Sequence, residues 1–150
     1  MTAFVTAGAG FLLAVLWFDL MFDIQVLGHR GPQLPGDVLS SISGYYRRVT
    51  TAARPMNRLI AAVMLGTLVA ILVQIIRGDA PRAASWASLA LAASAIVLAA
   101  AHTVPGAVRL GARTDTVEHQ SRLARSIWRD HLVCVVAIGF LLVIQLAFAR

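Results

Sequence analysis

The stretch LIAAVMLGTLVAILVQII, residues 59–76, is the clearest indication of the fold, because it places 18 residues without a formal charge between Arg58 and Arg77. At 1.5 Å per residue, such a segment forms a helix of about 27 Å, close to the roughly 30 Å hydrocarbon core of a bilayer. Three further stretches share its length and apolar character, residues 3–24, 83–101 and 132–149. We therefore expect the chain to cross a membrane four times.

The composition agrees with a membrane protein and excludes an ordinary soluble domain. Hydrophobic residues make up 59% of the chain and charged residues 13%, and the mean hydropathy is +0.77. Lipid offers no partner to backbone N–H and C=O groups, so the spans must be helices. No basic residue precedes the first span, which we expect to be retained rather than cleaved as a secretion signal. The sequence predicts an all-α, four-helix integral membrane bundle that forms a single domain over residues 1–150.

The basic residues predict the orientation of this bundle. All 13 are arginine, and ten of them lie in the connections between spans one and two and between spans three and four. These ten are Arg30, Arg47, Arg48, Arg54, Arg58, Arg109, Arg113, Arg122, Arg125 and Arg129. By the positive-inside rule, both connections face the cytoplasm and both termini lie outside, in a bacterial plasma membrane. The basic charge then reflects topology and anionic lipid, and we expect no nucleic-acid partner.

The two long connections have helical patterns of their own. Residues 37–49 are typical of an amphipathic helix at the membrane interface, with Asp37 as its cap. Pro105 is expected to end the third span, because proline disrupts a continuing helix. From Asp115 to about Phe148 no helix breaker occurs. The fourth helix should therefore be longer than the membrane is thick, with its first four turns projecting into the cytoplasm.

Small residues recur at every fourth position in spans one and three, which lets helices approach closely in lipid. The two sets are Thr6, Gly10 and Ala14, and Ala84, Ser88 and Ala92. We expect them to pack inside the bundle, although one set could form the contact of a homo-oligomer, which is the assembly we expect. The single cysteine, Cys134, is interpreted as a small buried apolar residue.

Ionisable and amide side chains from all four spans are predicted to meet at the cytoplasmic leaflet. Asp19 and Asp23 lie one turn apart on the same face of span one. The topology places five further polar residues at that level: Asn57, Arg58, His102, Arg129 and His131. An unpaired carboxylate in hydrocarbon costs several kcal/mol, so the two aspartates need partners. The nearest candidates are the two arginines and the two histidines.

This polar cluster has two interpretations. It is either a set of buried ion pairs that ties the bundle together, or a pocket for a small hydrophobic or aromatic molecule. In the pocket, Asp19 and Asp23 would position the histidines, and His102 or His131 would transfer the proton. The groups that would contact the ligand are Trp17, Asn57, Arg58 and Arg129. The two histidines and two aspartates come from three separate spans without a local ligand spacing, so a metal stays an open question, and we expect no cofactor.

Four short motifs carry a resemblance to a known family. They are YYRR at residues 45–48, PMNR at 55–58, HTVP at 102–105, and RDH at 129–131, which opens the last span. Together with the four spans they resemble the anthrone oxygenase-like family of small membrane proteins. The resemblance implies oxidation of an anthrone by molecular oxygen without a metal or flavin, with the histidines of the last two motifs at matching positions. The aspartates of span one have no counterpart in that pattern.

Two other classes of function remain open. One is a small proton-coupled transporter, in which Asp19 would exchange protons for a cationic drug, although the arginine-rich side would repel cations. The other is a non-catalytic membrane partner subunit that uses the long fourth helix for docking. A transporter predicts drug resistance on expression, a partner subunit predicts co-purification with another protein, and an enzyme predicts turnover in detergent.

Overall fold

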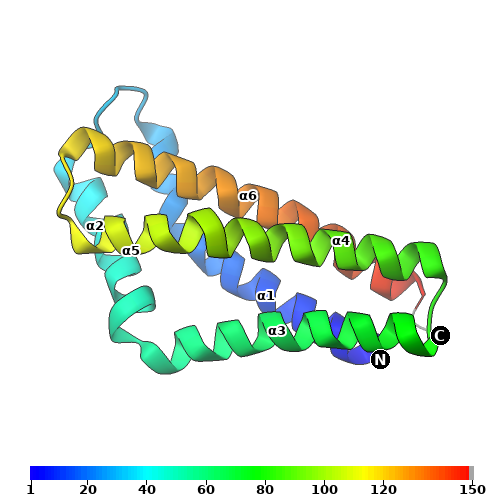
Figure 1. Ribbon diagram of the computed structural model, residues 1–150. Coiled ribbons are helices and arrows are strands. Elements are labelled where there is room, and N and C mark those ends of the chain that lie inside the picture. Colours follow the sequence, from blue (N-terminus) through cyan, green and yellow to red (C-terminus); the bar gives the residue numbers. More distant parts are fainter. Residues whose placement is uncertain (149–150) are drawn as a thin grey trace.

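The computed structural model describes residues 1–148, apart from the side chain of Arg54, and over that range it contains helices and no strand (Figure 1). The elements, in chain order, are α1 (Thr2–Asp23), a 3₁₀ turn η1 (Ile24–Gly28), α2 (Gly36–Arg47), a π-helical turn η2 (Arg48–Ala52), α3 (Arg54–Arg77), α4 (Arg82–Leu98), a second π-helical turn η3 (Ala99–Thr103), α5 (Val104–Ala112) and α6 (Val117–Ala147). The last residue of the expected fourth span, Ala149, and Arg150 lie outside the described residues.

Four of the helical segments are long and apolar enough to cross a membrane, which confirms the predicted all-α membrane bundle. They are Thr2–Gly28, Pro55–Arg77, Arg82–Ala112 and Val117–Ala147. In Figure 1 they run along the length of the molecule, with the N-terminus and the end of α6 at one end and α2 at the other. We call these the terminal end and the arginine-rich end.

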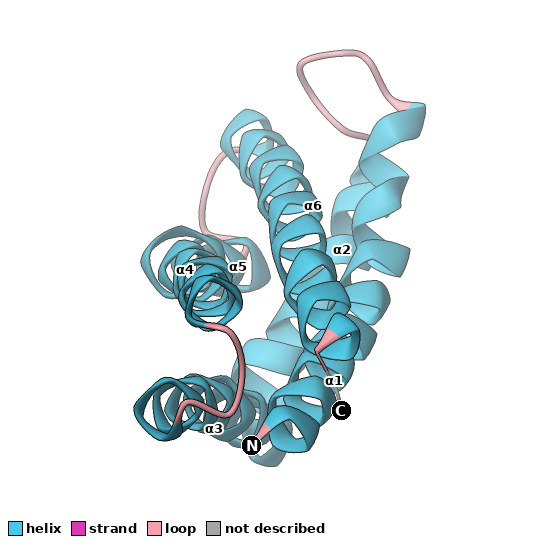
Figure 2. Ribbon diagram, turned by 90° about the vertical axis from the view of Figure 1, so that its right-hand side faces the viewer, coloured by secondary structure: helices cyan, strands magenta, loops and turns pink. Residues whose placement is uncertain are grey.

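The sequence predicted that the third span ends at Pro105, and this prediction is wrong because the helix continues past that residue. The π-helical turn η3 joins α4 to α5, and Pro105 lies in the first turn after it. A proline clashes with the carbonyl of the preceding turn, and a π-helical turn relieves the clash by changing the hydrogen-bond register. Viewed from the terminal end, α5 lies directly behind α4 (Figure 2). The result is one helical rod of 31 residues, as long as α6.

The predicted helix starts are wrong by one or two residues. The Asp37 side chain makes no cap hydrogen bond and lies in the first turn of α2, where a carboxylate still favours the helix dipole. The cap of α6 is Thr116, whose Oγ1 accepts a hydrogen bond from the backbone N of His119 at 3.3 Å. Asp115 precedes this cap and pairs with Arg109 at 2.9 Å.

The buried apolar residues form two separate cores. The first lies among α1, α3, α4 and α6 and includes Val5, Ile71 and Leu141. The second lies at the arginine-rich end, where the buried residues of α2 pack against α5 and the beginning of α6. The first turns of α6 therefore do not project as a free arm. One face of these turns, which includes Ala124 and Ile127, packs against α2 and α5.

Close packing joins α2 to α5. A Cβ built on Gly111 would lie 2.8 Å from the backbone N of Arg47, nearer than real Cβ atoms approach a backbone. The loop before α2 is held as well, since the Arg125 guanidinium donates to the carbonyls of His29, Gly31 and Pro32. These contacts fix the position of α2 over the end of α1.

The small-residue prediction is confirmed for span three and wrong for span one. Ala84, Ser88 and Ala92 are buried, mainly where α4 packs on α6. In span one, a Cβ on Gly10 would meet nothing, whereas Gly8 lies directly against Thr67 of α3. The buried residues of that face are Val5, Ala9 and Leu12. The buried position of Cys134 agrees with its predicted role.

A polar network closes the terminal end. Gln74 of α3 and Gln145 of α6 donate to each other's side-chain carbonyls, at 3.1 and 3.3 Å. Gln145 also donates to Ser88 of α4 at 2.9 Å, and Gln74 donates to Thr2 of α1 at 3.2 Å. All four long helices are thereby joined through hydrogen bonds in apolar surroundings.

Candidate functional site

Five side chains at the arginine-rich end form the candidate site, which we call the clasp. They are Asp19 and Asp23 of α1, Tyr45 and Tyr46 of α2, and His131 of α6. Tyr46 Oη donates to Asp23 Oδ1 at 2.5 Å, and His131 Nδ1 donates to Asp23 Oδ2 at 2.6 Å. Asp23 is 0% exposed. Both of its oxygens are therefore paired within the protein.

Asp19 is held less completely than Asp23. Tyr45 Oη donates to Asp19 Oδ1 at 2.7 Å. Asp19 Oδ2 lies 3.8 Å from His131 Nε2, which is beyond hydrogen-bond distance. The Asp19 side chain remains 15% exposed. One carboxylate oxygen of Asp19 thus lacks a close donor from the clasp.

Aromatic contacts position the two tyrosines. The ring of Tyr45 stacks on Phe22 of α1, with centroids 4.0 Å apart and an interplanar angle of 10°. Tyr46 packs edge-on against Tyr45 at 5.3 Å and lies within 6.4 Å of the His131 ring. Such stacked and edge-on geometries are the favoured ones for aromatic pairs. They hold α2 across the end of α1.

Both tyrosine hydroxyls stay protonated at neutral pH. Burial, and then the negative charge of Asp19, raise the pKa of Tyr45. Burial, and then the charge of Asp23, raise the pKa of Tyr46 further still. Because a phenol can donate only while it is protonated, these shifts preserve both hydrogen bonds to the aspartates.

A second pair lies beside the clasp. His102 Nδ1 is 2.6 Å from Asp130 Oδ2, and Thr103 Oγ1 donates to the same oxygen at 3.0 Å. The His102 side chain is 57% exposed, whereas that of Asp130 is 12% exposed. Asp130 and His131 are neighbours in α6, and they contact different helices. The two histidines of the predicted site therefore belong to separate pairs.

The structure brings together only part of the predicted site. Asp19, Asp23 and His131 meet, whereas Trp17 is 66% exposed and makes none of the contacts of the clasp. Of the candidate partners of the aspartates, His131 contacts them, whereas Arg58 and Arg129 are exposed and the two tyrosines supply the remaining contacts. Burying a guanidinium costs more free energy than burying a phenol that keeps its hydrogen bond.

Tyr45 and Tyr46 were missed as site residues. A signal for Tyr46 was present, since Leu39, Ile42 and Tyr46 recur at the helical spacing of a single buried face. A hydroxyl on the buried face of a helix needs an acceptor. The unpaired aspartates of span one were the acceptors that the sequence had already identified.

A cavity of about 350 Å³ lies beside the clasp, between α1, α3 and the α4–α5 rod. We call it the lateral cavity. The α3 residues that line it come from the first half of that helix, whereas the buried residues Thr67, Ala70, Ile71 and Gln74 lie in the second half. Apolar residues line most of it, and the residues with polar groups in its lining are Asp19, Tyr45, Tyr46, Thr50, Asn57, Thr103 and His131. Phe18 and Met56 line the cavity and are exposed, so it opens at the apolar surface of the bundle.

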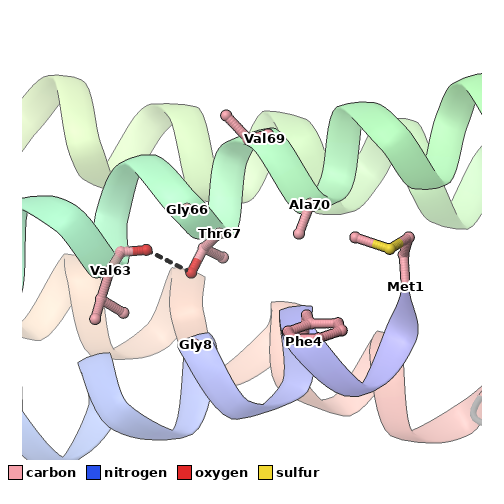
Figure 3. Close-up of a pocket in the computed structure, with 8 residues that line it drawn as sticks. All are labelled: Met1, Phe4, Gly8, Val63, Gly66, Thr67, Val69 and Ala70. Atoms are coloured by element: carbon pink, nitrogen blue, oxygen red, sulfur yellow. Dashed lines mark hydrogen bonds between the residues drawn. The ribbon is translucent and has the colours of Figure 1, made fainter.

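A second depression, of about 300 Å³, lies between α1 and α3 nearer the terminal end (Figure 3). Its one polar side chain is Thr67, whose hydroxyl donates within its own helix to the carbonyl of Val63 at 2.8 Å. This groove offers little chemistry for recognition. Among residues 1–148, no group of three or more His, Cys, Asp or Glu side chains is arranged to hold a metal ion.

The fold and the clasp define an integral membrane protein of four long helices, in which buried carboxylates join the first helix to the last. The chain belongs to the SHR3 chaperone family, described as ER membrane protein SH3, which matches residues 1–148. The comparisons with curated proteins and with solved structures gave no match.

The family assignment corrects two expectations. The resemblance to the anthrone oxygenase-like family is wrong, since the match over residues 1–148 is to a different family. The HTVP and RDH motifs have a structural explanation, because His102 and Asp130 pair with each other and Pro105 follows a π-helical turn. The bacterial plasma membrane is wrong as well, because the family is one of ER membrane proteins.

Proposed function

We propose that this chain is a non-catalytic chaperone of the ER membrane, which binds other membrane proteins before they are fully folded. The observation that carries the proposal is the match of residues 1–148 to the SHR3 chaperone family. This function corresponds to the membrane partner subunit that the sequence left open. The arginine-rich end would face the cytosol, and both termini would face the ER lumen.

The geometry of the clasp supports a structural role for most of its members. Asp23 is fully buried and accepts hydrogen bonds at both oxygens, which suits a residue that holds helices together. A general base needs a free lone pair within reach of a substrate. Each oxygen of Asp23 already accepts a hydrogen bond, one from Tyr46 and the other from His131, so this residue does not meet that requirement.

The lateral cavity supports binding of another membrane helix. Between helices in lipid there is no hydrophobic driving force, so association depends on close packing and on polar contacts. The first half of α3 is only partly buried against the core, and the space beside it combines apolar walls with a few polar groups. A partner helix that passes this opening would find both kinds of contact.

A small hydrophobic ligand in the lateral cavity is the second candidate. The cavity volume of about 350 Å³ lies at the lower end of the range of small-molecule pockets. The chaperone is preferred because the family assignment supports it directly. The expected homo-oligomer stays a prediction.

The test is to fill the lateral cavity in cells that depend on this chain. Ala99→Phe places a ring in the cavity, because Ala99 is one of the residues that line it. Ala100→Phe is the matched control, since Ala100 is exposed in the same π-helical turn and does not line the cavity. The measurement is the fraction of newly made multi-pass membrane proteins that leaves the ER, and the fraction that aggregates there.

Without the chain, we expect a set of multi-pass proteins to aggregate and to stay in the ER. Wild type and Ala100→Phe should restore their exit, and Ala99→Phe should not. Normal exit in the absence of the chain would contradict a chaperone function. Full activity of Ala99→Phe would show that the lateral cavity is not where clients bind.

A further inference from the structure

The two aspartates of α1 differ in a way that points to a binding site. Asp23 is completely buried and does not line the lateral cavity, whereas Asp19 lines it and keeps part of its side chain exposed. Tyr45 occupies Asp19 Oδ1, and Oδ2 has only His131 Nε2 nearby, at 3.8 Å. Asp19 therefore presents a carboxylate oxygen without a close donor to a cavity within the membrane.

The charges around the cavity favour a cation as its occupant. The clasp contains two carboxylates and one imidazole, and both tyrosines are neutral. Its formal charge is negative whether His131 is protonated or not. The residues that line the cavity, all within the described part of the chain, include no arginine. A positive group that entered the cavity would therefore meet a centre of net negative charge, in which His131 is the one group that can also carry a positive charge.

The lining of the cavity suits a long side chain with a charged end. The cavity holds about 350 Å³, and apolar side chains line it together with Asp19, among them Leu16, Ile60, Met64 and Ile96. An aliphatic stem can pack against such walls while its polar head reaches Asp19. Lysine and arginine have this amphipathic form.

We propose that the lateral cavity binds a basic side chain, lysine or arginine, of a client's transmembrane helix, and that Asp19 contacts its charged head. This inference rests on the proposed chaperone function and names the class of client that it serves. A basic residue in a membrane helix is costly to expose to lipid until its partner helix arrives. The cavity would supply a temporary carboxylate partner at the depth of the membrane where clients need one.

The test uses the full chain in phospholipid vesicles and a synthetic helix as the probe. The probe is a leucine-rich transmembrane peptide of about 22 residues with one lysine in the half of the bilayer that contains Asp19. The control peptide has leucine at that position. Binding is measured by energy transfer between labelled protein and labelled peptide, for wild type, Asp19→Asn and Asp19→Glu.

We expect wild type to bind the lysine peptide about tenfold more tightly than the leucine peptide. Asp19→Asn should bind both peptides equally, because its amide still accepts from Tyr45 but carries no charge. Asp19→Glu should recover part of the preference. If Asp19→Asn proves too unstable to measure, Ala99→Phe replaces it, since it fills the cavity and leaves the carboxylate in place.

Equal binding of the two peptides by wild type would overturn this inference and would leave the chaperone function standing. An undiminished preference for lysine in Asp19→Asn or Ala99→Phe would overturn it as well. Dodecylamine is the control for a free amphipathic amine. If wild type binds dodecylamine and not the lysine peptide, a client helix is the wrong occupant. Normal ER exit without the chain would instead refute the proposed function itself.

Discussion

Replacing Asp23 by alanine tests the structural part of the clasp most directly. The substitution leaves the Tyr46 hydroxyl and His131 Nδ1 without their acceptor, at a position that is 0% exposed. Hydrogen bonds to a charged group are worth about 1.5–3 kcal/mol each. Breaking a buried ionic pair from one side costs about 3–5 kcal/mol. Both estimates give an expected loss of about 4 kcal/mol in the free energy of unfolding.

Asp19→Ala is the matched control, because it removes a carboxylate from the same face of the same helix. Asp19 accepts one hydrogen bond and is partly exposed, so we expect a loss of about 1.5 kcal/mol. The assay is reversible unfolding of each variant in mixed micelles, followed by circular dichroism while the denaturing detergent increases. The difference between the two variants is the quantity of interest.

Equal losses for the two alanine variants would refute this reasoning, and so would a loss below about 1 kcal/mol for Asp23→Ala. A double-mutant cycle adds an independent check. Tyr46→Phe should weaken the wild type and should have little effect when Asp23 is already alanine, because the hydroxyl then has no partner to lose. Additive effects of the two substitutions would show that the hydrogen bond between them contributes little.

Three further predictions follow from contacts elsewhere in the molecule. Gly111→Ala should lower the free energy of unfolding by about 1–3 kcal/mol, because the new methyl group would lie 2.8 Å from the backbone of α2. Gly139→Ala is the control, since its methyl group would meet nothing within 4 Å, and it should be neutral or slightly stabilising when both variants are compared by thermal unfolding. Gln74→Leu should cost about 1–2 kcal/mol because it leaves the amide of Gln145 without its main partner, and the double leucine variant should recover stability in the same assay. Burial raises the pKa of Tyr46 above its ordinary value of 10.0, so the contribution of this group to stability is present below pH 10 and is lost as the pH rises further. The melting temperature of wild type should therefore fall more steeply between pH 9.5 and 11 than that of Tyr46→Phe. Parallel curves for the two proteins would contradict the raised pKa.

The sequence predicts the membrane bundle well, because the signals involved are local. An uncharged run such as residues 59–76 has few alternatives to a membrane helix. The spacing of Asp19 and Asp23 placed both on one helix face, and the topology correctly brought His131 to the same level. These inferences needed only helix geometry and the order of the spans.

The tertiary partners of the aspartates could not be obtained in this way. Tyr45 and Tyr46 reach α1 only because the loop after η1 turns α2 back across the end of the bundle. That loop is fixed by long-range contacts, such as those of Arg125 with the carbonyls of residues 29–32, which no local pattern encodes. Charge made the arginines and the histidines the candidate partners, whereas the free-energy cost of burying a guanidinium favoured the tyrosines over the arginines.

The break expected at Pro105 failed for a related reason. Proline is a reliable helix breaker only when the helix on either side keeps a regular hydrogen-bond register. The π-helical turn over residues 99–103 shifts that register, and nothing in its sequence, AAAHT, predicts such a turn. The HTVP motif at residues 102–105 lies at this junction, and it contributed to a resemblance to a family to which the chain does not belong.

The pairing of Asp23 with His131 has a consequence for the synthesis of the chain, because 108 residues separate the two partners. At about 5–20 residues per second, the ribosome needs roughly 5–20 s to make that interval. Tyr46 emerges 23 residues after Asp23, so one oxygen of the carboxylate finds its donor early. The other oxygen waits for the last helix. The first span must therefore persist in the translocation site or the bilayer with an incompletely paired acid, and the bundle closes only after the helix that carries His131 has been made.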